Sequence, residues 1–294
     1  MEVIKKIMEK TIKRYWPVFL IPTMAAFLIG FIVPFAEGIY LSFCKFTTIR
    51  DAEFVGLQNY IDAFKDATFP DAFKFTTLFA IVTLVLINVL AFLVALALTQ
   101  KIKGTNIFRT IFFMPNLIGG IVLGYVWQLI FDAIFSKFDT ALKLNEVLGF
   151  WGLVILVCWQ QIGYMMIVYI AGLQAIPEDI QEAAMIDGAG SFRVFYHIAV
   201  RLSISTILVV FLFSFVFNWN ETYTTNTMLG DALTLVPAKL ALFDNGSTGA
   251  TGNVINEANR MAATLISIAP LLALYMVVQK QFIQGIENTG ITGE

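Results

Sequence analysis

Charged side chains are scarce in this chain of 294 residues, because Asp, Glu, Lys and Arg together make up only 14% of it. Hydrophobic residues account for 58%, and the mean hydropathy of +0.78 lies outside the range of ordinary soluble domains. A net charge of −2 offers no basic surface of the kind that binds nucleic acid. We therefore expect an integral membrane protein in a lipid bilayer, with no nucleic-acid partner.

Residue types that often carry metal sites and catalysis are also rare. The chain has two cysteines, Cys44 and Cys158, and one histidine, His197. Cys44 lies near an expected outer helix end and Cys158 inside an apolar run, which argues against a disulfide and a thiolate metal site. We interpret both cysteines as packing residues. A single histidine argues against a histidine-based metal centre or a catalytic triad.

Motifs for ATP hydrolysis and hydrolytic catalysis are missing. The sequence contains no Gly-x-x-x-x-Gly-Lys-Ser/Thr phosphate loop, no Gly-x-Ser-x-Gly elbow and no His-Glu-x-x-His. It also lacks a pair of acids at membrane depth, since Glu37 and Glu221 lie near outer helix ends, so proton-coupled transport is poorly supported. We expect the chain to be no enzyme and to hold no cofactor, so that any energy comes from a partner.

Six apolar segments are long enough to cross a bilayer. They cover approximately residues 16–43, 77–99, 111–131, 150–175, 202–217 and 261–279. The expected fold class is an all-α polytopic membrane protein with about six transmembrane helices, forming a single transmembrane domain over residues 1–294.

Polar and helix-breaking residues interrupt three of these segments. The third contains Pro115 and several glycines, which suits either a moving gate or tight packing. The fourth carries Gln160, Gln161, Tyr164 and Tyr169, and we expect this side to face the bundle interior, because polar groups at membrane depth are costly unless paired or hydrated. Asn88 in the second segment is expected to join helices in preference to contacting substrate.

The distribution of basic residues orients the chain. With both termini inside, eleven of the 19 Lys and Arg residues fall on the cytoplasmic side, and eight are spread over the longer outer loops. The positive-inside rule favours this orientation. Both termini, and the polar segment 177–190 between the fourth and fifth spans, are therefore expected in the cytoplasm.

The pattern within segment 177–190 is typical of a short soluble helix. Glu178 and Asp179 place negative charge at the positive end of the helix dipole, and Asp187-Gly188 is a suitable C-terminal stop. A helix of roughly ten residues is about 15 Å long, too short to span a membrane and suited to filling a groove.

One face of this helix suits docking. Ile180, Ala183 and Ala184 follow an i, i+3, i+4 spacing, and the small alanines would let the walls of a groove approach the helix backbone. The alternative is an interfacial helix that merely connects two spans.

The same segment carries a resemblance to a known family. Glu-Ala-Ala-x-x-Asp-Gly-Ala, followed by Phe192, Phe195 and Ile198, resembles the cytoplasmic loop of the membrane subunits of ATP-binding cassette (ABC) importers that depend on a substrate-binding protein. In that family the loop is the coupling helix, which docks into a cleft of the ATPase subunit. The family pattern continues into Leu-Pro, where this chain departs with Val200-Arg201. The resemblance implies a type I importer permease fold and assigns ATPase coupling to Glu182, Ala183, Ala184, Asp187 and Gly188.

Amides and aromatic rings gather where the fifth apolar segment ends. Sugars present hydroxyls to amides and carboxylates and C–H faces to rings, so this chemistry suits a polyol. The stretch also resembles the Trp-Asn-Glu segment of carbohydrate-type permeases for maltose-like oligosaccharides and glycerol phosphate. The expected substrate-path residues are Asn218, Trp219, Asn220, Glu221 and Tyr223. The alternative for the tryptophan is an interfacial anchor.

The resemblance implies an assembly in a bacterial or archaeal cytoplasmic membrane. Its expected partners are a second, similar permease subunit, two ABC ATPase subunits that hold ATP and Mg²⁺, and an external substrate-binding protein. This chain would then be the permease subunit of an ATP-driven importer for a sugar or oligosaccharide. The alternatives are a passive channel or facilitator, and a membrane scaffold without transport.

Overall fold

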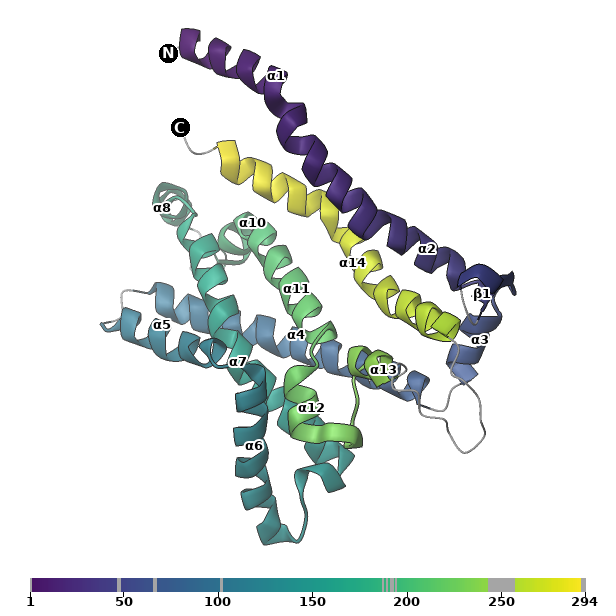
Figure 1. Cartoon of the computed structure of the whole chain (residues 1–294). Coiled ribbons are helices and arrows are strands. Elements are labelled where there is room, and N and C mark those ends of the chain that lie inside the picture. Colours follow the sequence, from purple (N-terminus) through teal and green to yellow (C-terminus); the bar gives the residue numbers. More distant parts are fainter. Residues whose placement is uncertain are drawn as a thin grey trace. The chain divides into compact units, whose positions relative to one another are not determined.

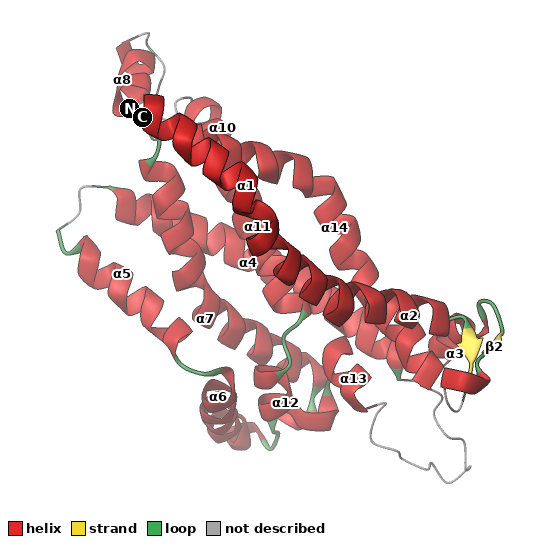
Figure 2. Ribbon diagram, turned by 45° about the horizontal axis from the view of Figure 1, so that its top comes forward, coloured by secondary structure: helices red, strands yellow, loops and turns green. Residues whose placement is uncertain are grey.

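The computed structural model describes residues 2–46, 49–65, 68–100, 103–186, 188, 190, 193, 195–242 and 257–291. Helices dominate this part of the chain (Figures 1 and 2). The α-helices are α1 (Glu2–Phe27), α2 (Val33–Leu41), α3 (Gln58–Lys65), α4 (Phe69–Thr99), α5 (Thr105–Phe113), α6 (Gly120–Phe135), α7 (Glu146–Gln174), α8 (Glu178–Ile186), α10 (Val200–Leu202), α11 (Ile204–Trp219), α12 (Tyr223–Leu229), α13 (Val236–Leu242) and α14 (Glu257–Ile291). The shorter elements are the π-helical turns η1 (Leu28–Ile32) and η6 (Phe195–Ala199), the 3-10 turns η2 (Ile49–Asp51), η3 (Met114–Leu117), η4 (Ser136–Phe138), η5 (Leu142–Leu144) and η7 (Gly230–Ala232), and the paired strands β1 (Cys44–Lys45) and β2 (Glu53–Phe54). The all-α fold class is confirmed.

The number of spans also agrees with the sequence. Among the described residues, five helices are long and apolar enough to cross a membrane. The helices α11 and α12 meet at a bend of 44° and give a sixth span if the pair counts as one. About six transmembrane helices are therefore present.

Several helices extend beyond the apolar segments that predict them. The helix α4 begins at Phe69 instead of near residue 77, and α14 continues to Ile291. An apolar segment marks the part that suits the hydrocarbon, whereas helical hydrogen bonds continue through polar turns at the headgroup level. The limits of the membrane-embedded parts stay predictions.

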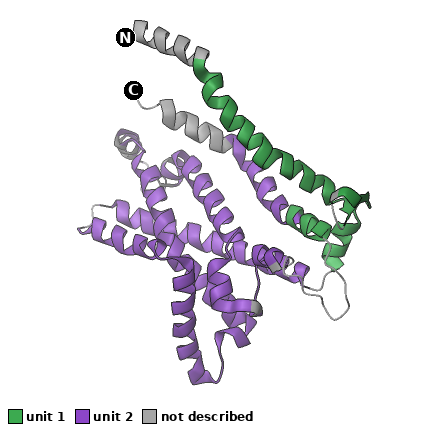
Figure 3. Cartoon of the chain, in the orientation of Figure 1, with its two compact units in different colours: residues 1–66, 243–265 green, residues 67–242, 266–294 purple. Residues whose placement is uncertain are grey.

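The chain forms two compact units (Figure 3). One contains residues 1–66 and 243–265, and the other contains residues 67–242 and 266–294. The single transmembrane domain expected from the sequence stays a prediction.

In the first unit, the β1–β2 hairpin is fastened to α3 by a buried amide. The Asn59 side chain donates from Nδ2 to the backbone oxygens of Ser42, at 2.7 Å, and Cys44, at 2.8 Å. The hydroxyls of Ser42 and Tyr60 are also hydrogen-bonded, at 2.7 Å. These bonds satisfy polar groups in a part of the chain that has little other core, so the segment around Asn59 has a structural role.

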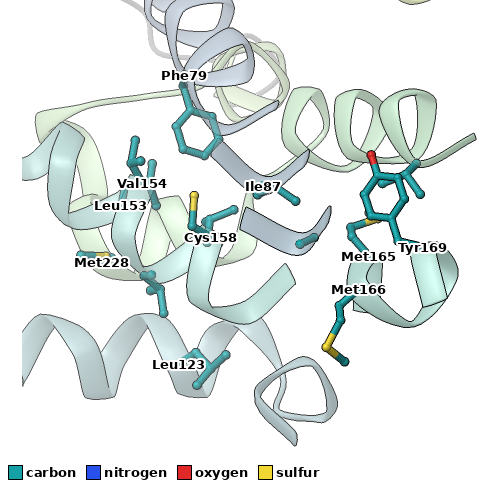
Figure 4. Close-up of a cluster of buried hydrophobic side chains, with 14 of the residues drawn as sticks. Phe79, Ile87, Leu123, Leu153, Val154, Cys158, Met165, Met166, Tyr169 and Met228 are labelled. Atoms are coloured by element: carbon teal, nitrogen blue, oxygen red, sulfur yellow. The ribbon is translucent and has the colours of Figure 1, made fainter. Parts of the chain in front are cut away.

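In the second unit, α4 and α7 pack side by side in the same direction. Phe75 of α4 meets Phe150 of α7 with ring centroids 5.9 Å apart, and Phe92 meets Tyr169 at 5.2 Å. The Tyr169 hydroxyl donates to Oδ1 of Asn88 at 2.7 Å, which confirms that Asn88 joins two helices. Figure 4 shows part of the apolar core that these two helices share.

The helix α11 runs opposite to α7. Gln161 of α7 lies against Asn218 near the end of α11, whereas Gly172, farther along α7, lies against Thr206 near the start of α11. The end of α7, the start of α11 and the end of α4 therefore share one end of the bundle. This end carries the segment that contains α8.

Both cysteines are buried and unpaired with each other. Cys158 belongs to the core between α4 and α7 (Figure 4), and Cys44 is fully buried in the first unit. The interpretation of both as packing residues is confirmed.

Candidate functional site

Two helix breaks meet at the middle of α7. The chain leaves helical geometry between η3 and α6, at Ile118 and Gly119, and again between α11 and α12, after Trp219. Both breaks lie beside Gln160 and Gln161, which stand at the midpoint of the 29-residue α7. Breaks at this depth leave backbone polar groups in the middle of the bundle, where they are tolerated only against protein or a water-filled cavity. We call this region the midpoint junction.

The two glutamines of α7 each bind one of the broken segments. Gln160 donates from Nε2 to the Ile118 oxygen at 3.3 Å, a carbonyl that the break leaves without a helical partner. Gln161 donates from Nε2 to Oδ1 of Asn218 at 3.2 Å. The expectation that this side of α7 faces the bundle interior is confirmed. The two glutamines hold both broken segments against α7.

Glycines hold the second halves of the two broken helices together. A Cβ added at Gly120 of α6 would come within 2.8 Å of the Thr224 hydroxyl of α12, and one at Gly124 within 3.0 Å of the Thr224 oxygen. The absence of side chains therefore permits the close contact of α6 and α12. Of the two possibilities left open by the proline and glycines of this segment, tight packing is observed here.

The structure separates the five expected path residues. Asn218 is fully buried, with Nδ2 donating to the Ser214 oxygen at 2.7 Å. Trp219 is 2% exposed and donates from Nε1 to the Ser267 oxygen of α14 at 2.9 Å. Both side chains are thus engaged within the bundle, and their role in the substrate path stays a prediction.

Glu221 caps α12. Its carboxylate accepts hydrogen bonds from the backbone N–H groups of Thr224, at 2.6 Å, and Thr225, at 3.0 Å, and from the Thr225 hydroxyl. A carboxylate at a helix N-terminus satisfies orphan donors and favourably opposes the dipole. The cap could not be recognised from the sequence before the start of α12 was known, and the role of Glu221 in the substrate path stays a prediction.

Two of the five residues remain available to a ligand. Asn220 is exposed and donates from Nδ2 to the Val216 oxygen at 2.8 Å, and Tyr223 is 70% exposed. These two residues flank the second break. The exposed polar surface of the midpoint junction therefore combines an amide with an aromatic ring.

Two buried polar atoms lie beside this junction, and sequence reasoning missed one of the two residues, Ser214. In the described part of the chain, Oε1 of Gln161 and Oγ of Ser214 are buried without a hydrogen-bond partner. Ser214 precedes Asn218 by one helical turn, so a helical projection could have placed it beside the amide, although its polarity looked ordinary within an apolar run.

The helix α8 matches the predicted coupling segment in position and length. It has nine residues, Ala183 is exposed and Ala184 is half-buried, and Ile180 is 42% exposed. Gly188 follows it with a φ of +82°, the left-handed conformation expected at a helix stop. The apolar face of α8 is thus not covered by its own unit.

Two of the predicted coupling residues have less structural support. The backbone of Glu182 belongs to α8, whereas Asp187 lies outside the described residues. The coupling role of all five residues stays a prediction. For metal binding, the described residues include no group of three or more His, Cys, Asp and Glu side chains that could hold an ion.

Comparison with known proteins identifies a family match. The family model described as "Binding-protein-dependent transport system inner membrane component" matches residues 92–288. This region contains α8 and the midpoint junction.

Curated relatives share this region. The chain is 40% identical over 196 residues to the probable starch degradation products transport system permease protein AmyD of Thermoanaerobacterium thermosulfurigenes, covering 64% of this chain and 67% of the relative. It is 31% identical over 215 residues to the multiple sugar-binding transport system permease protein MsmF of Streptococcus mutans, covering 69% and 74%.

A solved structure shares the fold. A chain of a bacterial ABC transporter involved in the import of the acidic polysaccharide alginate superposes with a TM-score of 0.69 at 18% identity. The match covers 94% of this chain and 98% of that one. This likeness confirms the type I importer permease fold.

Proposed function

The chain belongs to the family of binding-protein-dependent transport system inner membrane components, and we propose that it lines the path of an ATP-driven importer for a sugar or oligosaccharide. It is a transport subunit and not an enzyme. In the proposed assembly it pairs with a second permease subunit, two ABC ATPases bind and hydrolyse ATP with Mg²⁺, and an external binding protein delivers the substrate.

The observation that carries the substrate class is the exposed chemistry of the midpoint junction. Asn220 and Tyr223 present an amide and an aromatic ring beside a helix break. Amides bind hydroxyls and rings pack on the apolar faces of pyranoses, which suits a carbohydrate better than an ion or a lipid. The starch-product and multiple-sugar permeases among the relatives support the same class.

The observation that supports ATP-driven coupling is α8. A nine-residue helix with an uncovered apolar face stands between α7 and α11, where a groove of an ATPase could receive it. A passive channel would have no use for such a helix, and a family defined by dependence on a binding protein gives no support to a channel or a scaffold.

We predict that Asn220→Ala and Tyr223→Ala each impair uptake without reducing the amount of protein in the membrane. Losing one hydrogen bond at a desolvated site costs about 1–3 kcal/mol, roughly five- to a hundred-fold in apparent affinity. The measurement is the concentration dependence of uptake of a radiolabelled oligosaccharide. Asn106→Ala, which removes an exposed amide of α5 away from the junction, is the matched control. Unchanged kinetics in both junction variants would remove these residues from the path.

We further predict the orientation of the chain. Both termini and α8 should be cytoplasmic, and the basic Lys103 and Arg109, which follow the end of α4, should share that side. In a background with Cys44 and Cys158 replaced by alanine, a cysteine at Lys65 should react with an impermeant thiol reagent in intact cells. A cysteine at Asp187 should react only after permeabilisation, and its labelling in intact cells would reverse the topology.

A further inference from the structure

A second polar site lies away from the midpoint junction. A pocket of about 640 Å³ opens in the second unit at the N-terminal ends of α4 and α7 and is bordered by the segment that leads into α13. Figure 1 shows α13 beside the first turns of α4, and the Val236 amide donates to the Thr76 hydroxyl at 2.8 Å. None of the residues assigned above to the transport path or to α8 lines this pocket.

The pocket combines charges of both signs. Its charged lining residues are Asp71 and Lys74 of α4, Glu146 of α7, and Lys239 of α13. Within the described part of the chain, no hydrogen bond or ion pair engages the side chains of Asp71, Lys74 or Glu146. Separate acidic and basic groups are therefore available to one ligand that carries both charges.

Helix length places these charges at the level of lipid headgroups. With 31 residues at 1.5 Å each, α4 is about 46 Å long, whereas the hydrocarbon core is about 30 Å thick and the whole bilayer about 40–45 Å. Lys74 is the last charged residue before a mainly apolar run without charges that extends to Thr99. We therefore expect the first turns of α4, with Asp71, to lie in the headgroup layer.

The pocket continues into an exposed apolar stripe. Leu78 lines the pocket and is 51% exposed, and the residues that follow it on the same face of α4 are also exposed. This stripe comprises Leu78, Ile81, Val85 and Val89. It extends about 16 Å along the helix, close to the thickness of one hydrocarbon leaflet.

We propose that this pocket binds a zwitterionic phospholipid with a primary ammonium group, such as phosphatidylethanolamine. Asp71 and Glu146 would accept hydrogen bonds from the ammonium, Lys74 would hold the phosphate, and an acyl chain would follow the stripe. A loop of the binding protein is the rival occupant. The headgroup depth and the continuous apolar stripe favour the lipid, because a protein loop has no use for a 16 Å apolar extension.

The test measures lipid binding to the full-length chain. The protein is purified in detergent with its copurifying subunits and depleted of lipid, and single lipids are then titrated into it and their binding is followed by native mass spectrometry. Dioleoyl phosphatidylethanolamine should bind at least about tenfold more tightly than the phosphatidylcholine or phosphatidylglycerol analogue. Choline cannot donate hydrogen bonds from its nitrogen, and phosphatidylglycerol has no ammonium. Equal binding of the three lipids would overturn the proposal.

Variants locate the binding. Lys74→Gln combined with Glu146→Gln should abolish the preference, and Glu146→Gln alone should reduce it if the double variant is poorly produced. Lys143→Gln, three residues from Glu146 but outside the lining, should preserve it. A lipid preference that survives in the pocket variants overturns the proposal. So does a variant that binds lipid normally but in which the binding protein no longer stimulates ATP hydrolysis, because that result would assign the pocket to protein docking. Neither result bears on the transport path.

Discussion

Replacing Gly188 by valine is expected to abolish uptake and to weaken retention of the ATPase, while the protein remains folded in the membrane. Gly188 has a φ of +82°, a conformation that costs a residue with a side chain about 1–2 kcal/mol. A Cβ at this position would meet nothing within 4 Å, so the strain acts through the backbone alone. The chain would leave α8 in another direction and misplace the coupling helix.

Gly190→Val is the matched control for this variant. It lies two residues farther on, a Cβ there also meets nothing within 4 Å, and its φ is outside the left-handed range. It should therefore retain transport. The two variants are compared by pull-down of the ATPase and by uptake in the same cells.

Ala184→Trp tests the same coupling by bulk instead of backbone conformation. Ala184 is half-buried and shares a face with the exposed Ile180, so an indole there should prevent a groove from closing over α8. Uptake should fall to background, with ATPase retention reduced at least about tenfold. If Ala184→Trp and Gly188→Val both keep full ATPase association and transport, α8 is not the coupling helix.

The second large effect is expected at Gly163 of α7, which packs directly against the backbone of α5. A Cβ at this position would collide with the Phe112 carbonyl, and because that atom belongs to the backbone, no side-chain rotation can relieve the overlap. Overpacking of this kind costs about 1–3 kcal/mol or more. Gly163→Ala should lower both the thermal stability in detergent and the amount of protein in the membrane.

Gly149→Ala in the same helix is the control for this prediction. Its Cβ would lie 3.1 Å from the end of the flexible Leu233 side chain and 3.3 Å from the Leu142 backbone oxygen, contacts that a small shift relieves, whereas a Cβ at Gly163 would overlap the Phe112 backbone. Both changes replace glycine by alanine within α7. Alanine favours a helix by about 1 kcal/mol over glycine, and this gain is the same in both variants. The two variants therefore differ only in the steric overlap that the new methyl group creates. Equal stability of the two variants would show that the contact between α5 and α7 adjusts freely.

The coupling segment was predictable because its signals are local. Acids at Glu178 and Asp179, a small apolar face and Gly188 all act within one or two helical turns, and α8 with its left-handed stop follows from them. By contrast, the helix cap at Glu221 and the burial of Trp219 could not be predicted from their neighbours in the sequence, because they depend on where α12 begins and on how α14 packs.

By itself the sequence determined the membrane class, the approximate number of spans and the place of α8, because burying apolar side chains in lipid and starting or stopping a helix depend on residues close along the chain. Only the tertiary structure decided which polar residues meet. The Gln161–Asn218 bond joins residues 57 apart, and the contact of Gly120 with Thr224 joins two separate broken helices. Such pairs depend on the direction and depth of whole helices. Packing sets both, and for this reason Asn218 is inside the bundle while Asn220, two residues on, is exposed.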